Sequence, residues 1–252
     1  MRTARELSLL FQRHFTQQLR NPTWLFVGLS SPVLYLALFS PLLKHYAGPH
    51  ATTGAVLDSF FPGILALLAF ASGIAQGFTT IFELRAGVTE RLRVTPASRF
   101  AILAGPLLSG MAFIYIFDAV ALGVAAAFGF HVHWAGLLVL AVLIGLFMVM
   151  MSAWSVAMAL TIKEISGFAS AVNGLQLPAL LLAGVLLPVS LGPSWLRDLA
   201  HADPLYYVVE AARSLGAGTL SGEHVWLGFA VTVPLCAMVL SWATNVFRKA
   251  VS

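Results

Sequence analysis

The 252-residue sequence is poor in charge: 10% of its residues are Asp, Glu, Lys or Arg, whereas 59% are hydrophobic. A soluble globular domain carries roughly a quarter charged residues. With this shortage and a mean hydropathy of +0.89, the chain has too little polar surface to cover a water-soluble particle. The composition therefore predicts an integral membrane protein.

Cysteine and lysine are also scarce, and both shortages exclude chemistry. The single Cys236 has no partner in the chain for a disulfide. None of the three lysines, Lys44, Lys163 and Lys249, ends a G-x-x-x-x-G-K phosphate loop, so the chain does not bind ATP through that motif. The motifs H-E-x-x-H and C-x-x-C are absent as well. We therefore expect neither an enzyme nor a cofactor bound by this chain.

Two histidines, His131 and His133, stand beside Trp134 near the expected outer surface. A zinc site needs more ligands than two imidazoles. We interpret the pair as interfacial polar residues in preference to a metal site, and we predict no metal.

Six apolar segments are long enough to cross a bilayer, which takes about 20 helical residues. The first begins near Trp24 and is too long and too far from the start for a signal peptide, so we interpret it as a retained span. The sequence predicts an all-α membrane domain over residues 1–252. Its expected spans are 23–43, 60–82, 100–128, 137–162, 168–187 and 226–246.

The basic residues are distributed unevenly between the loops. Eleven of the fourteen Lys and Arg residues flank one side of these spans, and Lys44, Arg197 and Arg213 lie on the other side. Short loops rich in Lys and Arg stay in the cytoplasm. The pattern predicts a multi-pass protein of the cell (inner or plasma) membrane, with both termini cytoplasmic and residue 210 outside.

The segment before the first span, residues 1–22, has an apolar stripe: Leu7, Phe11, Phe15 and Leu19 recur every four residues. Basic and polar residues fill the rest of its surface, and Asn21-Pro22 ends the pattern. This is typical of an amphipathic helix in the cytoplasmic interface. The alternative, a solvated tail, does not require the stripe.

The segment 83–99, ELRAGVTERLRVTPASR, is too charged to enter the bilayer. Gly87 can end the preceding helix, Thr89 can cap a short new one, and Thr95-Pro96 can end it. We predict a short cytoplasmic helix that displays Glu90, Arg91 and Arg93. On pattern alone, a face that is merely solvated remains an alternative.

The segment 188–225 predicts a helical hairpin on the outer face. One or two helical turns are expected at 195–200, after Trp195. Asp203 is a suitable N-cap with Pro204 at the first helical position, and Glu210 can pair with Arg213 at i, i+3. Leu205, Val208, Val209, Ala212 and Leu215 form the expected apolar face.

Asp118 is the ionisable residue expected deepest in the membrane. A carboxylate there normally faces the bundle interior or a water-filled path, although a protonated Asp118 bonded to Tyr115 is an equal alternative. Gln76, Asn173 and Gln176 are the other polar residues at depth. These four are the candidate substrate path. Because no Lys or Arg lies in the spans, an amphipathic or weakly cationic cargo suits them better than an anion.

The order of these segments resembles that of the type-2 ABC-transporter permeases, and among them the daunorubicin/doxorubicin-resistance-like drug exporters. The resemblance covers essentially the whole chain and is strongest in GVTERLRVTPASRFAIL and in LLPVSLGPSWLRDLAHADPLYYVVEAARSL. One departure is Asp203-Pro204, where that family usually has Asn-Pro; both residues cap helices.

The resemblance implies a multidrug or antibiotic-resistance exporter in which ATP and Mg²⁺ are bound by a separate ATPase subunit. It also implies two permease copies, identical or related, and an outer hairpin that covers the exit. The implied coupling residues, which contact the ATPase, are Glu83, Glu90, Arg91, Leu92, Arg93, Thr95, Pro96 and Arg99. A glycan or lipid-linked saccharide exporter of the same fold is the nearest alternative, followed by an ATP-independent channel or a membrane scaffold.

Overall fold

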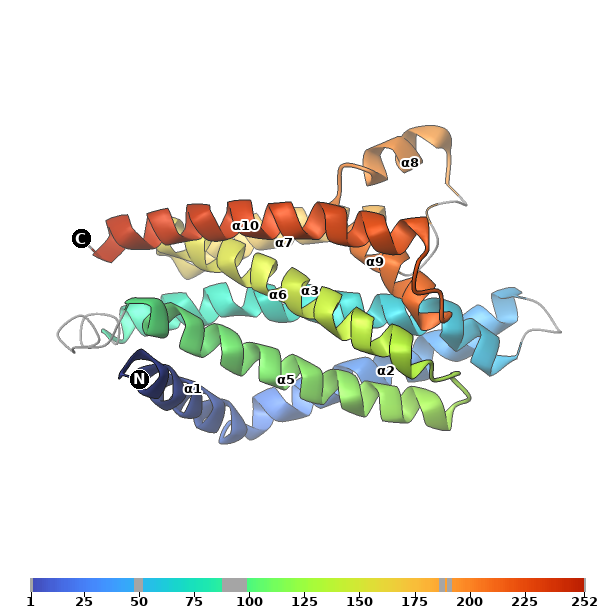
Figure 1. Ribbon diagram of the computed structural model, residues 1–252, viewed down its shortest axis with the longest axis horizontal. Helices are drawn as coiled ribbons and strands as arrows, with labels where there is room; N and C mark the ends of the chain where they lie inside the picture. The colour runs from blue at the N-terminus through green and yellow to red at the C-terminus, as the bar shows by residue number, and fades with distance from the viewer. Residues whose placement is uncertain (1, 48–51, 88–98, 186–188, 190–191, 252) are drawn as a thin grey trace.

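The computed structural model describes residues 2–47, 52–87, 99–185, 189 and 192–251. Within these residues every regular element is an α-helix, as the sequence predicted (Figure 1). The helices are α1 (Arg2–Leu19), α2 (Pro22–Ala47), α3 (Thr53–Arg85), α5 (Arg99–Ala127), α6 (Trp134–Ile162), α7 (Ile165–Leu182), α8 (Ser194–Ala200), α9 (Pro204–Gly216) and α10 (Glu223–Val251).

Five of the described helices, α3, α5, α6, α7 and α10, are long and apolar enough to cross a membrane. The described apolar part of α2, Pro22–Leu38, is shorter than the other five. Five candidate spans are therefore present, and the sixth, α2, stays a prediction.

The ends of two helices differ from the predicted ones. α3 begins at Thr53, seven residues before the predicted start, because the hydroxyl of Thr52 accepts a hydrogen bond from the backbone N–H of Ala55 (3.2 Å). α7 ends at Leu182, before the predicted residue 187, and Gly184 follows with a φ of 65°. Gly87 adopts a φ of 66° just after α3, which agrees with its predicted role as a helix stop.

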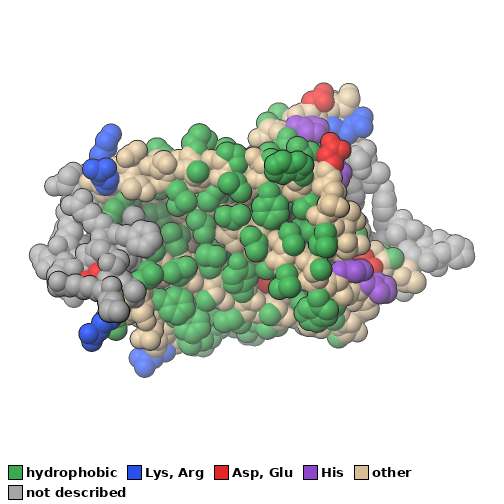
Figure 2. Space-filling model, in the orientation of Figure 1, with side chains coloured by type: hydrophobic (Ala, Val, Ile, Leu, Met, Phe, Trp, Pro, Cys, Tyr) green, Lys and Arg blue, Asp and Glu red, His purple; other side chains and the backbone are tan. Residues whose placement is uncertain are grey.

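The helices lie along one another in an elongated bundle, with both termini at one end (Figure 1). We call this the termini end. α8 and the connection between α5 and α6 lie toward the opposite end, which we call the hairpin end. In Figure 2, hydrophobic side chains cover the middle of one face, while charged side chains and His gather mostly at the two ends. This distribution is that of a membrane protein.

The centre of the bundle is the contact between α3 and α6. Gly73 faces the Cβ of Met151, so a side chain at this position would not fit. Ser155 fastens the same contact: its hydroxyl accepts from the N–H of Gly77 (2.9 Å) and donates to the carbonyl of Ile74 (2.7 Å). Small residues spaced four apart thus let the two backbones approach closely.

The amphipathic helix α1 packs against α5. The ring of Phe15 lies 4.8 Å from that of Phe113, and Gly105 leaves room for Leu10. The chain then turns into α2 at Asn21, whose side-chain oxygen accepts from the N–H of Trp24 (3.1 Å). Part of the apolar stripe therefore contacts protein.

Candidate functional site

A cavity of about 420 Å³ lies between α1, α3 and α5 in the half of the bundle nearer the termini; we call it the inner cavity. Its polar lining includes His14 and Gln18 of α1 and Gln76 and Glu83 of α3, and Trp24 and Phe113 supply apolar walls. The side-chain oxygen of Gln18 is buried and has no hydrogen-bond partner within the described part of the chain. The inner cavity can therefore hold a ligand with both polar and apolar groups.

His14 and Glu83 form the most unusual polar pair in this lining. The Nδ1 atom of His14 lies 3.7 Å from a carboxylate oxygen of Glu83, and the His14 side chain is almost fully buried. Burial, and secondarily the positive charge of Arg13, lower the pKa of His14 to about 4. The imidazole is thus neutral at pH 7 and can either donate or accept a hydrogen bond.

A smaller cavity of about 180 Å³ borders the same polar residues on the side of α6 and α10. His14, Gln76, Thr79 and Glu83 line both cavities. The sequence indicated Gln76 and Glu83 as site residues but not His14, because the fourfold apolar repeat of α1 gave no sign that a polar residue beside it would be buried.

The four candidate path residues do not meet in one cavity of this chain. Gln76 lines the inner cavity beside Gly110. Asp118 lies about two helical turns beyond Gly110 on α5, a distance of about 12 Å along the helix axis. Asn173 is exposed on α7 and Gln176 is half-buried there. Their joint role in a substrate path therefore stays a prediction.

Asp118 is half-buried, and its Oδ1 atom has no hydrogen-bond partner in the described residues. The hydroxyl of Tyr115, a possible partner in the sequence analysis, donates instead to the carbonyl of Ala141 on α6 (3.0 Å). The Oδ1 atom of Asp118 is thus buried without a partner among the described residues.

A third cavity, of about 340 Å³, lies nearer the hairpin end; we call it the outer cavity. Its walls come from α3, α6, α7 and α10, and the connection between α8 and α9 closes part of it. The lining is apolar and rich in aromatic and sulfur-containing side chains, among them Phe70, Phe147, Met150, Met151 and Trp154. Asp203 also lines it.

Asp203 caps α9 with Pro204 in the first turn, as predicted. Its Oδ1 atom accepts from the N–H of Leu205 (3.0 Å). Its Oδ2 atom is buried and has no hydrogen-bond partner in the described residues. Burial raises the pKa of Asp203 to about 6, an effect partly offset by the Leu205 hydrogen bond.

The outer hairpin is fastened to the bundle by Arg213. The predicted ion pair with Glu210 is present, with 2.7 Å between the charged atoms. The guanidinium also donates to the carbonyls of Gly184 (2.5 Å) and Ser59 (3.3 Å), beyond α7 and within α3. The expected apolar face of α9 is buried, whereas Trp195 of α8 is exposed.

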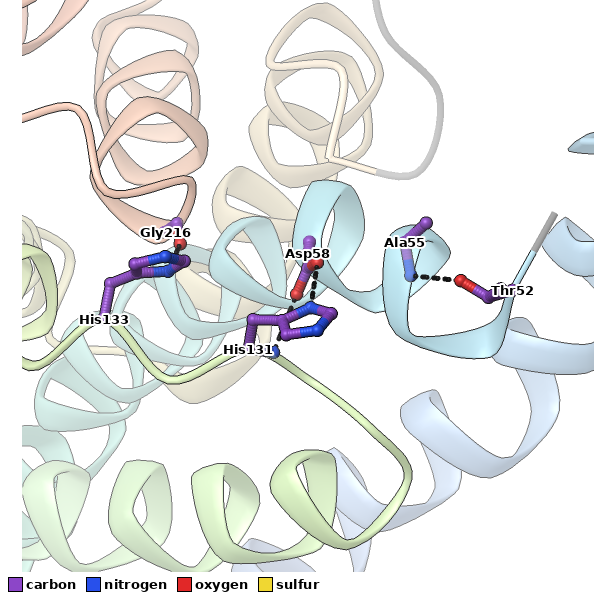
Figure 3. A network of polar contacts seen from close by, with 6 residues as sticks. All are labelled: Thr52, Ala55, Asp58, His131, His133 and Gly216. Atoms are coloured by element: carbon purple, nitrogen blue, oxygen red, sulfur yellow. Dashed lines mark hydrogen bonds and ion pairs between the residues drawn. The ribbon is translucent and has the colours of Figure 1, made fainter.

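Two histidine contacts hold the connection between α5 and α6 at the same end (Figure 3). The Nδ1 atom of His131 lies 2.8 Å from a carboxylate oxygen of Asp58, whose other oxygen accepts from the His131 N–H (2.9 Å). The Nδ1 atom of His133 lies 3.1 Å from the carbonyl of Gly216, at the end of α9. Neither Asp58 nor these pairings were predicted, because the partners are more than 70 residues apart.

Six of the eight predicted coupling residues lie within 88–98, outside the described part of the chain. They are Glu90, Arg91, Leu92, Arg93, Thr95 and Pro96. The two that flank this segment can be placed. Glu83 lies in the last turn of α3 and Arg99 is the first residue of α5. The end of α3 and the start of α5 both lie at the termini end (Figure 1).

Comparison with known proteins gives one family and several relatives. The model of the family described as "ABC-2 type transporter" matches residues 5–215. A protein of Cyanophora paradoxa named "Putative transport permease ycf38" is 31% identical over 216 residues, which cover 83% of this chain and 73% of the relative. The protein of the same name from Porphyra purpurea is 25% identical, over 85% of this chain and 75% of its own length.

Proposed function

Because the chain belongs to the ABC-2 type transporter family, we propose that it is the membrane permease subunit of an ATP-driven exporter whose ATPase is a separate chain. The family match over residues 5–215 carries this proposal. The missing phosphate loop supports it, since a permease without that motif must receive the work of ATP hydrolysis from a partner. ATP and Mg²⁺ are bound by that partner.

The proposed topology has six spans, with α2 as the first, and places the termini end in the cytoplasm. The segment 83–99 contains the short coupling helix, and Glu90, Arg91 and Arg93 contact the ATPase. The position of α3 and α5 supports this, because both helices lead into the segment at the termini end (Figure 1). α1 lies at the same end and contacts the same ATPase.

The proposed mechanism is alternating access at the interface of two permease copies. Closure of the ATPase pair moves residues 83–99, and the helices that they join reorient the path from the cytoplasmic side to the outer side. The inner cavity receives the cargo, and the hairpin of α8 and α9 covers the exit. Gln76, Asp118, Asn173 and Gln176 face the cargo at different stages.

The proposed cargo is an amphipathic or hydrophobic small molecule of the drug or antibiotic kind. The outer cavity supports this choice over a saccharide, because its described lining consists of apolar and aromatic side chains and one carboxylate. A saccharide path needs many hydrogen-bonding groups, which would otherwise be left unpaired.

Reversal of two charges, Arg91→Glu with Arg93→Glu, tests the coupling. Breaking desolvated charge pairs at an interface costs several kcal/mol, so the variant is expected to release the ATPase or to uncouple its turnover from export. Copurification of the ATPase, ATP turnover and export are measured. Thr95→Pro should impair coupling without changing charge, by distorting the end of the helix.

The matched control is Arg248→Glu with Lys249→Glu, which reverses two charges at the end of α10. It should retain ATPase association. Because both double variants weaken the positive-inside signal, their orientation is checked by labelling. Full ATPase association and full export in a correctly oriented Arg91→Glu, Arg93→Glu protein would show that the segment is a passive linker.

A further inference from the structure

The outer cavity combines an aromatic lining with a buried carboxylate oxygen. Its lining presents the aromatic side chains of Phe70, Phe147 and Trp154 and two methionines. The same cavity contains a carboxylate, Asp203, whose Oδ2 atom is buried without a hydrogen-bond partner in the described residues. A buried charge without a partner is costly, so this oxygen is stabilised by any cation that reaches it.

The charge of Asp203 is offset by the N–H of Leu205 at the start of α9, but by no cationic side chain in the described lining of the cavity. Among the described residues that line the cavity, Asp203 alone is ionisable. On α8, Arg197 and Asp198 are exposed, as is His201 just beyond that helix. Further along α9, Arg213 is paired with Glu210.

The cavity is also large enough and open enough to admit a ligand. Its volume of about 340 Å³ lies within the range of small-molecule pockets, which begins near 300 Å³. Leu175 and Pro178 of α7 line it and are themselves exposed on the surface of the bundle. A ligand dissolved in the membrane can therefore enter between α7 and α10.

We infer that the outer cavity binds lipophilic cations, with the positive group at Asp203 and the apolar body against Phe147 and Trp154. Aromatic faces attract cations, and this attraction is stronger when water is excluded. A lipid acyl chain could fill the same space but would leave the Asp203 oxygen unpaired, and an anion would be repelled. The inference names the cargo class of the proposed exporter and so rests on that proposal.

Binding of radiolabelled tetraphenylphosphonium to the full-length protein in phosphatidylcholine nanodiscs tests the inference without an ATPase. The charge of this probe is permanent, so any pH dependence belongs to the protein. Asp203→Asn keeps a helix-capping side chain and is expected to bind the probe about tenfold more weakly, because the attraction between the carboxylate and the cation is lost. Asp203→Ser, which also caps helices, serves as a second variant with the same expected loss.

The matched control is Asp198→Asn, the same change at an exposed site in α8, and it should bind like the wild type. Since the pKa of Asp203 is about 6, roughly a tenth of its carboxylates are ionised at pH 5. Because the protonated form still binds about a tenth as well, wild-type affinity should fall about fivefold between pH 7 and pH 5, and the Asp203→Asn affinity should not change.

Tetraphenylborate, a probe of the same shape and opposite charge, completes the test. Wild type should bind it no better than Asp203→Asn does. Equal binding of tetraphenylphosphonium by wild type and both Asp203 variants would overturn the inference, and so would equal, pH-independent binding of the two probes, which indicates a groove for lipid. Wild-type protein that binds the probe normally but neither associates with an ATPase nor exports cargo would contradict the proposed function alone.

Discussion

At the scale of single residues, Arg213 makes the contacts that position the outer hairpin. Its side chain is 13% exposed and contacts Glu210 and the carbonyls of Gly184 and Ser59. One planar guanidinium therefore joins α9 to α3 and to the end of α7. The geometry needs several donors in a fixed arrangement, which arginine has and lysine lacks.

Arg213→Lys is expected to lower the stability of the protein by about 2 kcal/mol, because the ammonium keeps the charge but cannot reach all three acceptors. Thermal unfolding in detergent measures the loss. Arg197→Lys, at an exposed position of α8, is the matched control and should unfold like the wild type. Equal unfolding temperatures of the two variants would mean that the carbonyl contacts of Arg213 do not contribute to stability.

The same residues show what the sequence could predict. The N-cap at Asp203 and the Glu210–Arg213 pair depend on neighbours within three positions, so local spacing was enough to predict them. The Arg213 contact with Ser59 and the His131 contact with Asp58 join residues 154 and 73 positions apart. Such contacts follow from the packing of whole helices, which a single sequence does not reveal.

At the scale of elements, α1 shows the limit of an amphipathic pattern. Its apolar stripe was interpreted as a membrane-facing surface, but Leu10 and Phe15 contact α5. Lipid tails and the apolar side of another helix are equally suitable partners for such a stripe. The pattern therefore predicted the helix and its apolar face correctly, and could not predict what covers that face.

Gly105→Val tests whether α1 is held by this contact. A Cβ at Gly105 would lie 2.8 Å from the Cβ of Leu10, so the new side chain must push α1 away from α5. Overpacking of this kind costs about 1–3 kcal/mol. A short cross-linker between cysteines at Phe15 and Phe113, in a Cys236→Ser background, measures the separation and should react less in the variant.

Gly123→Val is the matched control for that substitution. It adds the same side chain to the same helix at a position where a Cβ meets nothing within 4 Å. Its cross-linking yield should equal that of the double-cysteine protein in which both Gly105 and Gly123 are retained. A normal yield in Gly105→Val as well would show that α1 can shift at no cost, and that its contact with α5 is loose.

At the scale of the whole molecule, the inner and outer cavities both have walls formed by α3 and α6. The adjacent residues Phe147 and Met148 of α6 line different cavities, the outer and the inner one. On α3, Phe70 lines the outer cavity and Ser72 the inner one. The alternating access proposed above would therefore require a relative movement of α3 and α6 at this level.

The orientation of the bundle is the remaining large-scale prediction. Eleven of the fourteen basic residues flank the side of the predicted spans that carries both termini, and the termini lie together at one end of the bundle (Figure 1). Basic loops are retained in the cytoplasm. We expect a membrane-impermeant maleimide added to intact cells to label Asp198→Cys, and to leave Arg2→Cys, Arg91→Cys and Lys249→Cys unlabelled until the cells are opened.

Thr52→Cys extends this experiment to α2, the span that length and composition leave undecided. Thr52 is exposed and directly precedes α3. If α2 crosses the membrane, positions 2 and 52 lie on opposite sides, because about 20 helical residues suffice for one crossing and α2 has 26. Labelling of position 52 alone from outside is therefore the expected result, in a Cys236→Ser background that removes the native thiol.

Labelling of both positions from the same side would reduce the protein to five spans and place its termini on opposite sides. Labelling of position 91 from outside would reverse the orientation and remove the coupling segment from the reach of a cytoplasmic ATPase.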